Sequence, residues 1–183
     1  MEEIRVNLQD LRKELDRLEA GQTVLLSGTA YTARDAAHKR IMRLLDEEKP
    51  LPFDIKDAVI YYAGPTPKRN EQVIGACGPT TSGRMDVYTP RLIKAGLCGM
   101  IGKGERRKSV IDSMVLFGAV YFAAVGGAGA VCAQAIKAQE VIAFPELGCE
   151  SVKRLTLYEF PAIVAIDSRG RNLFAEGRKI YAE

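Results

Sequence analysis

Apolar residues along this chain repeat with two periods, and together these predict an α/β fold. Apolar positions spaced three and four residues apart predict helices at about 8–18, 33–45, 84–94, 108–117 and 127–136. Shorter apolar or alternating runs predict strands at about 23–26, 57–63, 71–77, 99–101, 118–127, 138–144, 153–159 and 161–167. Because helices and strands alternate through most of the chain, we expect the α/β class.

Length and composition fit one domain that spans residues 1–183. The 183 residues are 47% hydrophobic, enough to bury one sizeable core, and no internal repeat or low-complexity linker divides them. No apolar run approaches the roughly 18 residues of a membrane span. The charged segment MEEIRVNLQD at 1–10 lacks a signal-peptide core. We therefore expect no membrane association and a cytoplasmic location.

The charge of the chain argues against a nucleic-acid partner. Its net charge is +3, with 26 basic residues nearly matched by 23 acidic ones, whereas nucleic-acid binders show a clustered basic stripe. The short basic clusters at 68–69 and 106–108 are typical of solvated faces, and we predict that role for them.

The segment GPTTSGRMD at 78–86 combines a turn, hydroxyl groups and a guanidinium. Gly78 and Pro79 end the predicted strand at 71–77, and the three hydroxyl residues that follow lie where a helix is predicted to begin. Backbone N–H groups at such a position favour an anion. Arg84 adds a donor fork that matches a carboxylate or phosphate. A helix cap beside a solvated arginine is the alternative interpretation of this segment alone.

Two further strand-to-turn junctions each carry a cation. In SGTAYTARDAAHKR at 27–40, Thr32 and Asp35 form a capping-box pattern that predicts a helix start. Arg34 would then lie in the first helical turn, and His38 on the same face could point at the same ligand. In MIGKGER at 100–106, Lys103 lies between two glycines, which let the backbone approach a ligand closely. Three such junctions predict one anion-binding site.

These segments resemble the beta subunit, equivalently the C-terminal domain, of the class I iron–sulfur fumarate hydratases and the related L-tartrate dehydratases. The resemblance extends from 27–40 through 58–65, 78–86, 101–104 and 126–130 to ELGCES at 146–151 and EFPAIVAIDSRG at 159–170. Only ELGCES departs from the expected ELGMEA, which leaves the predicted site unchanged. The resemblance implies a swivelling β/β/α fold and half of a hydro-lyase that reversibly hydrates fumarate to L-malate, with L-tartrate dehydration as the alternative.

The resemblance also implies roles for individual residues. Arg34, Arg84 and Lys103 would bind the two carboxylates of a C4-dicarboxylate substrate, and Thr80 would transfer the proton as base or relay. His38 is a reserve candidate for orienting a site group, and Thr81 is a second reserve. Three acidic residues near these positions are expected to orient arginines or cap backbone N–H groups: Asp35, Asp86 and Glu105.

The cysteines predict where the cofactor of this family would lie. The chain has no CxxC pair, and its four scattered cysteines are expected to be buried free thiols: Cys77, Cys98, Cys132 and Cys149. The resemblance implies a [4Fe-4S] cluster held by an alpha subunit, so we expect this chain to bind none and to join that subunit in a hetero-oligomer. The rival hypothesis is a non-catalytic module that binds small anions without a partner.

Overall fold

The computed structural model describes residues 3–69, 71–124, 127 and 129–181. Within these residues, seven strands form one sheet: β1 (Ile4–Asn7), β2 (Thr23–Thr32), β3 (Val59–Tyr61), β4 (Gly99–Gly102), β5 (Val120–Ala123), β6 (Ile136–Ala143) and β7 (Val152–Ile166). The α-helices are α1 (Leu11–Glu14), α2 (Asp35–Asp46), α3 (Thr89–Ala95), α4 (Lys108–Phe117), α5 (Gly129–Gln134) and α6 (Leu173–Tyr181). Four short 3-10 helices join them: Leu8–Asp10, Leu15–Arg17, Ser82–Met85 and Pro145–Glu150.

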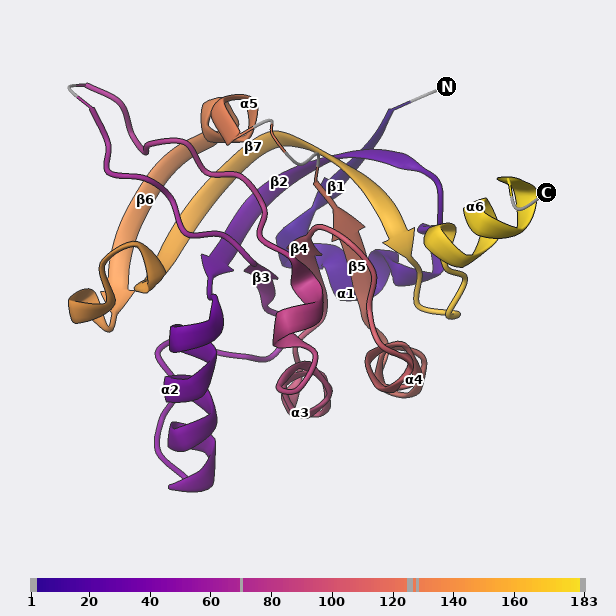
Figure 1. Cartoon of the computed structure of the whole chain (residues 1–183), viewed down its shortest axis with the longest axis horizontal. Helices are drawn as coiled ribbons and strands as arrows, with labels where there is room; N and C mark the ends of the chain where they lie inside the picture. Colours follow the sequence, from indigo (N-terminus) through magenta and orange to yellow (C-terminus); the bar gives the residue numbers. More distant parts are fainter. Residues whose placement is uncertain (1–2, 70, 125–126, 128, 182–183) are drawn as a thin grey trace.

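The sheet closes on itself through its longest strand. Strands β1 to β5 pair in parallel in the order of the chain. The 15-residue β7 runs antiparallel to β2, β5 and β6. Because β7 pairs with both β2 and β5, the strands β2, β3, β4, β5 and β7 form a ring. Figure 1 shows β7 and β2 as long curved strands that cross the molecule above the shorter β3, β4 and β5.

Alternate residues of the short strands pack into two separate hydrophobic clusters. Val59 and Tyr61 of β3 pack into one cluster with residues of β2, β5 and β7. Ile60 and the following Tyr62 pack into the other cluster, which α2, α3 and α4 cover. Strands buried on both faces need apolar residues at every position, as β3 shows. Figure 1 shows these three helices below the strands.

The α/β class is confirmed, and two elements match their predicted positions closely. Helix α4 spans the predicted 108–117, and β4 covers the predicted 99–101 with one further residue. The turn at 167–170 is present, with the Asp167 carboxylate accepting the N–H groups of Arg169 and Arg171 at 3.0 Å each. Part of the glycine-rich run at 126–130 lies outside the described residues. The swivelling topology stays a prediction.

The predicted strand at 71–77 is wrong. Ile74 and Cys77 are buried, but the backbone of this segment does not pair with a strand. Thr66 N, in a loop, donates to Ala76 O at 3.0 Å, and Cys77 N donates to the O of Gly129, the first residue of α5, at 3.0 Å. A Cβ at Gly75 would lie 2.3 Å from Thr66 O. The apolar run therefore reflects burial under a neighbouring loop, which periodicity does not distinguish from a strand.

Other boundaries differ for local reasons. The predicted strands at 153–159 and 161–167 are one strand, β7, because Pro161 is accommodated in the pairing opposite Leu25 beside a bulge. The predicted helix at 84–94 is divided into a 3-10 turn and α3, and the predicted helix at 8–18 into three short pieces. Strand β2 extends to Thr32, six residues beyond the predicted end at residue 26. Strand β1 and helix α6 were not predicted.

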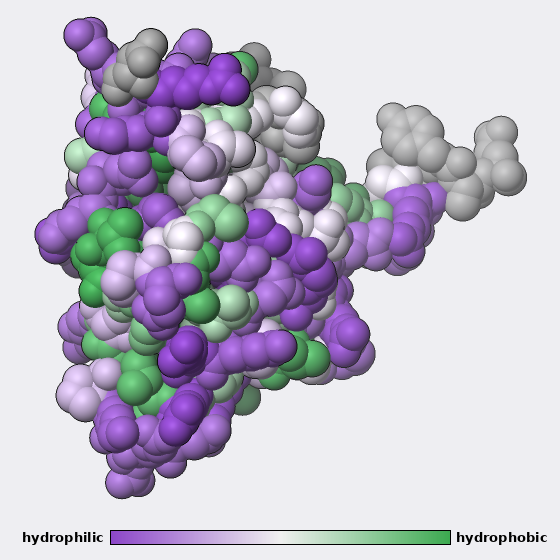
Figure 2. Space-filling model, turned by 60° about the vertical axis from the view of Figure 1, so that its left-hand side comes forward, coloured by the Kyte–Doolittle hydropathy of each residue, from purple (hydrophilic) through white to green (hydrophobic). Residues whose placement is uncertain are grey.

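The surface carries both apolar and polar residues. Figure 2 shows hydrophilic residues over much of one face, with separate apolar patches between them. The large apolar side chains that are exposed come from several elements: Val73, Val87, Val115, Leu116, Phe117, Val131, Val141 and Tyr158. In the described part of the chain, no helix combines the length and the apolar character that a bilayer crossing requires.

Candidate functional site

The carboxyl ends of three parallel strands carry the candidate site. Arg34 follows β2, Tyr62 follows β3 and Lys103 follows β4. The loop that contains Thr80 lies between the ends of β3 and β4, because Thr80 N donates to Tyr62 O at 2.7 Å and Lys103 N donates to Thr80 O at 3.3 Å. Ser82 N continues this pairing by donating to Lys103 O at 2.9 Å. Ligands of α/β sheets bind at such carboxyl ends.

Arg84 connects the loop to the beginning of α2. Its Nη2 donates to Thr80 Oγ1 at 2.7 Å and lies 3.1 Å from Asp35 Oδ2. The Arg84 side chain is 46% exposed, so a ligand can approach its guanidinium. A cation that donates to the threonine oxygen stabilises negative charge on that oxygen. As expected, Asp35 is placed to orient an arginine.

Arg34 is the residue that precedes α2, as the N-cap. Its guanidinium passes close to Gly64, where a Cβ would lie 2.9 Å from Nη1. The absence of a side chain at Gly64 therefore makes room for the arginine. Arg34 Nε is buried and has no hydrogen-bond partner within the described residues. An unpaired buried donor costs about 1–3 kcal/mol, which marks this atom as a candidate ligand contact.

The predicted capping box at the start of α2 is wrong. Thr32 belongs to β2, and its Oγ1 donates to Ser151 O at 3.1 Å. The Ala36 N–H in the first turn of α2 is accepted instead by Glu150 Oε2 at 2.9 Å. Glu150 Oε1 lies 3.5 Å from Arg34 Nη2. Sequence reasoning missed Glu150 because it is 114 positions from its backbone partner.

His38 lies beneath the site and does not point at the same ligand as Arg34. Its side chain is fully buried, with the ring centroid 5.6 Å from those of Tyr62 and Tyr88. His38 Nδ1 donates to Arg34 O at 2.8 Å, because a carbonyl oxygen can only accept. Burial lowers the pKa of His38 to about 4, so the imidazole is neutral at pH 7. The expected common direction of His38 and Arg34 is therefore not found.

Lys103 and Thr81 are adjacent across an isolated parallel bridge. The loop approaches Gly102 very closely, since a Cβ there would lie 2.0 Å from Ser82 Oγ. Thr81 is exposed, and Lys103 is partly buried. Among the described residues, Lys103 Nζ has no carboxylate within ion-pair distance, so its charge is available to a ligand.

A buried ion pair supports the loop from below. Arg106 Nε donates to Asp86 Oδ1 at 2.7 Å, and neither side chain is exposed. Arg106 also donates to Thr89 Oγ1 at 2.9 Å, and its guanidinium carbon lies 5.2 and 5.0 Å from the ring centroids of Tyr62 and Tyr121. The prediction of a solvated face at 106–108 is therefore wrong for Arg106. Its partner Asp86 was expected to orient an arginine, and does so.

The remaining acidic and hydroxyl groups near the loop have structural partners. Asp86 Oδ2 accepts the Arg107 N–H at 2.6 Å, and Tyr121 OH lies 2.9 Å from Ser82 Oγ. Burial raises the pKa of Tyr121 above its usual value, so this hydroxyl stays protonated at neutral pH. Glu105 pairs with Arg178 of α6. These contacts join the 82–89 segment to the 104–107 segment and support the loop that carries Thr80.

The cysteines do not form a cluster-binding set. Cys77, Cys98 and Cys132 are buried as expected, but Cys149 is exposed, which corrects the prediction for that residue. Cys149 lies in the turn before Glu150 instead of in the core. Among the described residues, no three His, Cys, Asp or Glu side chains are grouped to hold a metal ion. These donors therefore do not fit a [4Fe-4S] cluster.

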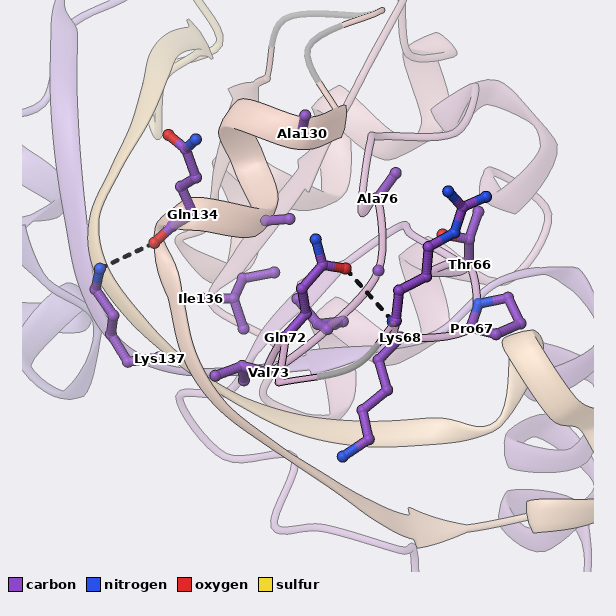
Figure 3. Close-up of a pocket in the computed structure, with 14 residues that line it drawn as sticks. Thr66, Pro67, Lys68, Gln72, Val73, Ala76, Ala130, Gln134, Ile136 and Lys137 are labelled. Atoms are coloured by element: carbon purple, nitrogen blue, oxygen red, sulfur yellow. Dashed lines mark hydrogen bonds between the residues drawn. The ribbon is translucent and has the colours of Figure 1, made fainter.

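Two hollows in the described part of the chain are lined by residues of the 65–76 loop. The larger, of about 870 Å³, lies between the 66–76 loop and the α5–β6 segment. Figure 3 shows Gln134 and Lys137 on one wall, joined by the 2.9 Å bond from Lys137 Nζ to Gln134 O, and Thr66 on the other. The second hollow, of about 570 Å³, is lined partly by Pro65, Cys149 and Lys153. Pro65 and Cys149 are the chain neighbours of Gly64 and Glu150, which lie close to the Arg34 side chain. Thr80 does not line this hollow.

Comparisons with known proteins agree in pointing to one family. The sequence model of the family described as Fumarase C-terminus matches residues 1–177. The chain is 38% identical over 177 residues to the putative L(+)-tartrate dehydratase subunit beta of Methanocaldococcus jannaschii, covering 93% of this chain and 91% of that protein. It is 32% identical over 176 residues to the L(+)-tartrate dehydratase subunit beta of Escherichia coli K12, covering 93% and 86%.

Longer relatives are also similar. Fumarate hydratase 2 of Leishmania major is 36% identical over 171 residues, which cover 92% of this chain and 30% of that protein. The chain thus spans about a third of the length of the fumarate hydratases it matches.

Proposed function

Because the chain belongs to the Fumarase C-terminus family, we propose that it is the beta subunit of a class I hydro-lyase that reversibly hydrates fumarate to L-malate. The observation that carries the proposal is the continuous set of contacts at the strand ends. Arg34 adjoins Asp35, Asp35 pairs with Arg84, Arg84 bonds Thr80, and Thr80 bonds the backbone of Lys103. A dicarboxylate needs cations at two ends. This set has Arg84 at the Thr80 hydroxyl and carries Arg34 and Lys103 on the adjoining segments.

The proposed chemistry of this chain concerns the proton beside the substrate carboxylate. In dehydration, Thr80 Oγ takes that proton either as an alkoxide, which becomes the hydroxyl, or as a relay that passes its own hydroxyl proton on to solvent. In hydration the same steps run in reverse, and the proton returns to the same carbon. Arg84 stabilises the charge on Thr80 Oγ through the 2.7 Å bond. Arg34, Arg84 and Lys103 bind the carboxylates. Arg84, which also bonds Thr80, stabilises the negative charge that grows as the proton leaves, because fixed cations stabilise such charge best.

The cluster and the rest of the active site are proposed to come from a partner. The family is the iron–sulfur type, and the described residues of this chain do not offer a cluster ligand set. Two relatives named as beta subunits match over most of their length, which supports a separate alpha subunit and a hetero-oligomer. A cytoplasmic location stays a prediction.

L-tartrate is the second candidate substrate. The two beta-subunit relatives carry tartrate dehydratase names and have nearly the length of this chain. Fumarate and tartrate differ by hydroxyl groups, which a site distinguishes through its hydrogen-bonding contacts.

One assay tests the proposed function. The chain is combined with its alpha subunit under oxygen-free conditions and assayed with malate, fumarate and both tartrate enantiomers. We expect the chain alone to be colourless and inactive, and the pair to interconvert fumarate and malate. Turnover confined to one tartrate enantiomer would support the second candidate. Dicarboxylate binding by a lone chain that no alpha subunit joins would support a non-catalytic module and overturn the proposal.

A further inference from the structure

Hydrogen bonds from Lys153, Ser151 and Thr32 fix the turn at 148–151. Lys153 Nζ donates to Ser151 Oγ at 2.6 Å, Gly148 O at 3.2 Å and Cys149 O at 3.3 Å. Ser151 Oγ donates to Gly148 O at 2.8 Å, and Thr32 Oγ1 of β2 holds Ser151 O. Gly148 has φ 58° and ψ −117°, a conformation that favours glycine. The turn is thus held in one shape beside the end of β2.

This turn presents the Glu150 carboxylate to the beginning of α2. Oε2 accepts the Ala36 N–H at 2.9 Å, and Oε1 lies 3.5 Å from Arg34 Nη2. The N-cap residue of α2 makes no side-chain cap of its own, because an arginine cannot accept a hydrogen bond. Glu150 therefore supplies both the missing cap and a countercharge beside Arg34.

Arg34 is held at its other end by His38. The His38 backbone N and Nδ1 both donate to Arg34 O, each at 2.8 Å. The backbone of Arg34 is fixed from within α2, and its guanidinium is faced by Glu150 from the 148–151 turn. The 3.5 Å separation is long for a direct hydrogen bond, so the guanidinium keeps donors for another carboxylate.

We propose that Glu150 is a positioning residue that orients the Arg34 guanidinium for substrate binding, an inference that rests on the proposed function. Arg34 binds the carboxylate in the ground state and in the transition state alike. Loss of its orientation should therefore weaken substrate binding and raise KM, while kcat stays close to the parental value. A carboxylate that competed with substrate for Arg34 would have the opposite effect, because its removal would lower KM.

Two substitutions separate positioning from helix capping. Glu150→Gln keeps an oxygen that can accept the Ala36 N–H but removes the charge beside Arg34. We expect this variant to unfold at the parental temperature and to show a KM for fumarate raised about fivefold, and Glu150→Ala to raise it about tenfold. Glu146→Gln is the matched control. Its carboxylate, in the same 3-10 segment, faces Arg40 of α2 at 3.4 Å instead of Arg34, and the KM should not change.

A double-substitution cycle gives the decisive readout in the assembled enzyme. If Glu150 acts through Arg34, Glu150→Gln should have no further effect on KM in an Arg34→Ala background. Equal effects in both backgrounds, or a parental KM in Glu150→Gln, would overturn the inference while the proposed function stands.

If the unsubstituted chain and its alpha subunit together show no turnover, the proposed function is refuted. Calorimetry of succinate binding to this pair would then test the inference. Weaker succinate binding in Glu150→Gln only when Arg34 is present would support it, and unchanged binding would overturn it.

Discussion

Substitution of Thr80 tests the proton-transfer role most directly. The loop residue is not a helix cap, because the 3-10 helix Ser82–Met85 has Thr81 at its N-cap position and no side-chain cap there. The Thr80 hydroxyl instead accepts from Arg84 Nη2 at 2.7 Å, and the residue is partly exposed. The stability cost of Thr80→Ala should therefore be near that of one ordinary hydrogen bond, about 0.5–1.5 kcal/mol.

The effect on turnover should be far larger than the effect on stability. Removing a positioned acid or base lowers the rate by roughly 100-fold to 10,000-fold, or about 3 to 5 kcal/mol in the barrier. Thr80→Ser keeps the hydroxyl and should retain most of the activity. Thr81→Ala is the matched control, because Thr81 is exposed and has no side-chain cap bond, and it should leave turnover nearly unchanged.

The assay is exchange of the proton beside the carboxylate with deuterated solvent, followed by NMR in the assembled enzyme. Loss of this exchange in Thr80→Ala, with normal folding and assembly, is the expected result. Exchange at the parental rate would refute the assignment of Thr80 and would require another group to move the proton.

Three further predictions concern Arg84, His38 and Arg106. Arg84→Lys replaces the two-nitrogen donor group of the guanidinium by a single ammonium, so kcat/KM should fall by a factor that corresponds to about 2–4 kcal/mol. Steady-state kinetics close to those of the unsubstituted enzyme would contradict this. Burial holds the folded pKa of His38 near 4, below its ordinary 6.5, so the free energy of unfolding should fall by about 3 kcal/mol as pH falls from 6.5 to 4. Urea titrations of His38→Asn should lack this part of the pH dependence. Arg106→Met leaves Asp86 buried without its ion-pair partner and should lower the free energy of unfolding by about 3–5 kcal/mol, whereas the exposed Arg107→Met should change it by less than about 0.5 kcal/mol in the same denaturant titration.

The sequence predicted the parts of the fold that depend on local pattern. Helix α4 has an apolar stripe and a glycine immediately after it, and its bounds match the prediction. The 71–77 segment has the same local signal as a strand, yet its burial comes from a loop 10 residues earlier, at Thr66. The closure of the ring by β7 likewise depends on pairing between strands that are distant in sequence, which periodicity does not encode.

In the candidate site too, residues with a local sequence signal were predicted, and a residue that depends on a distant partner was missed. Arg34, Arg84 and Lys103 were predicted because each follows an apolar run and a turn signal. Arg34 and Lys103 do follow parallel strands, β2 and β4, whereas the apolar run before Arg84 is not a strand. Arg106 was missed because it begins a run of three basic residues, and a run of charges predicts solvent exposure. Its burial depends on Asp86, which sits 20 positions earlier and neutralises it.

The contacts around Arg34 hold its backbone and its side chain from opposite sides. An N-terminal helical turn with free N–H groups attracts anions, but it also needs partners for those groups. Glu150 satisfies the Ala36 N–H, and His38 fixes the Arg34 carbonyl from the buried side. The guanidinium lies beside Gly64, whose missing Cβ gives it space, and its side chain stays 24% exposed. If Arg34 binds a substrate carboxylate as proposed, its guanidinium is oriented before binding, so less conformational entropy is lost when the carboxylate arrives.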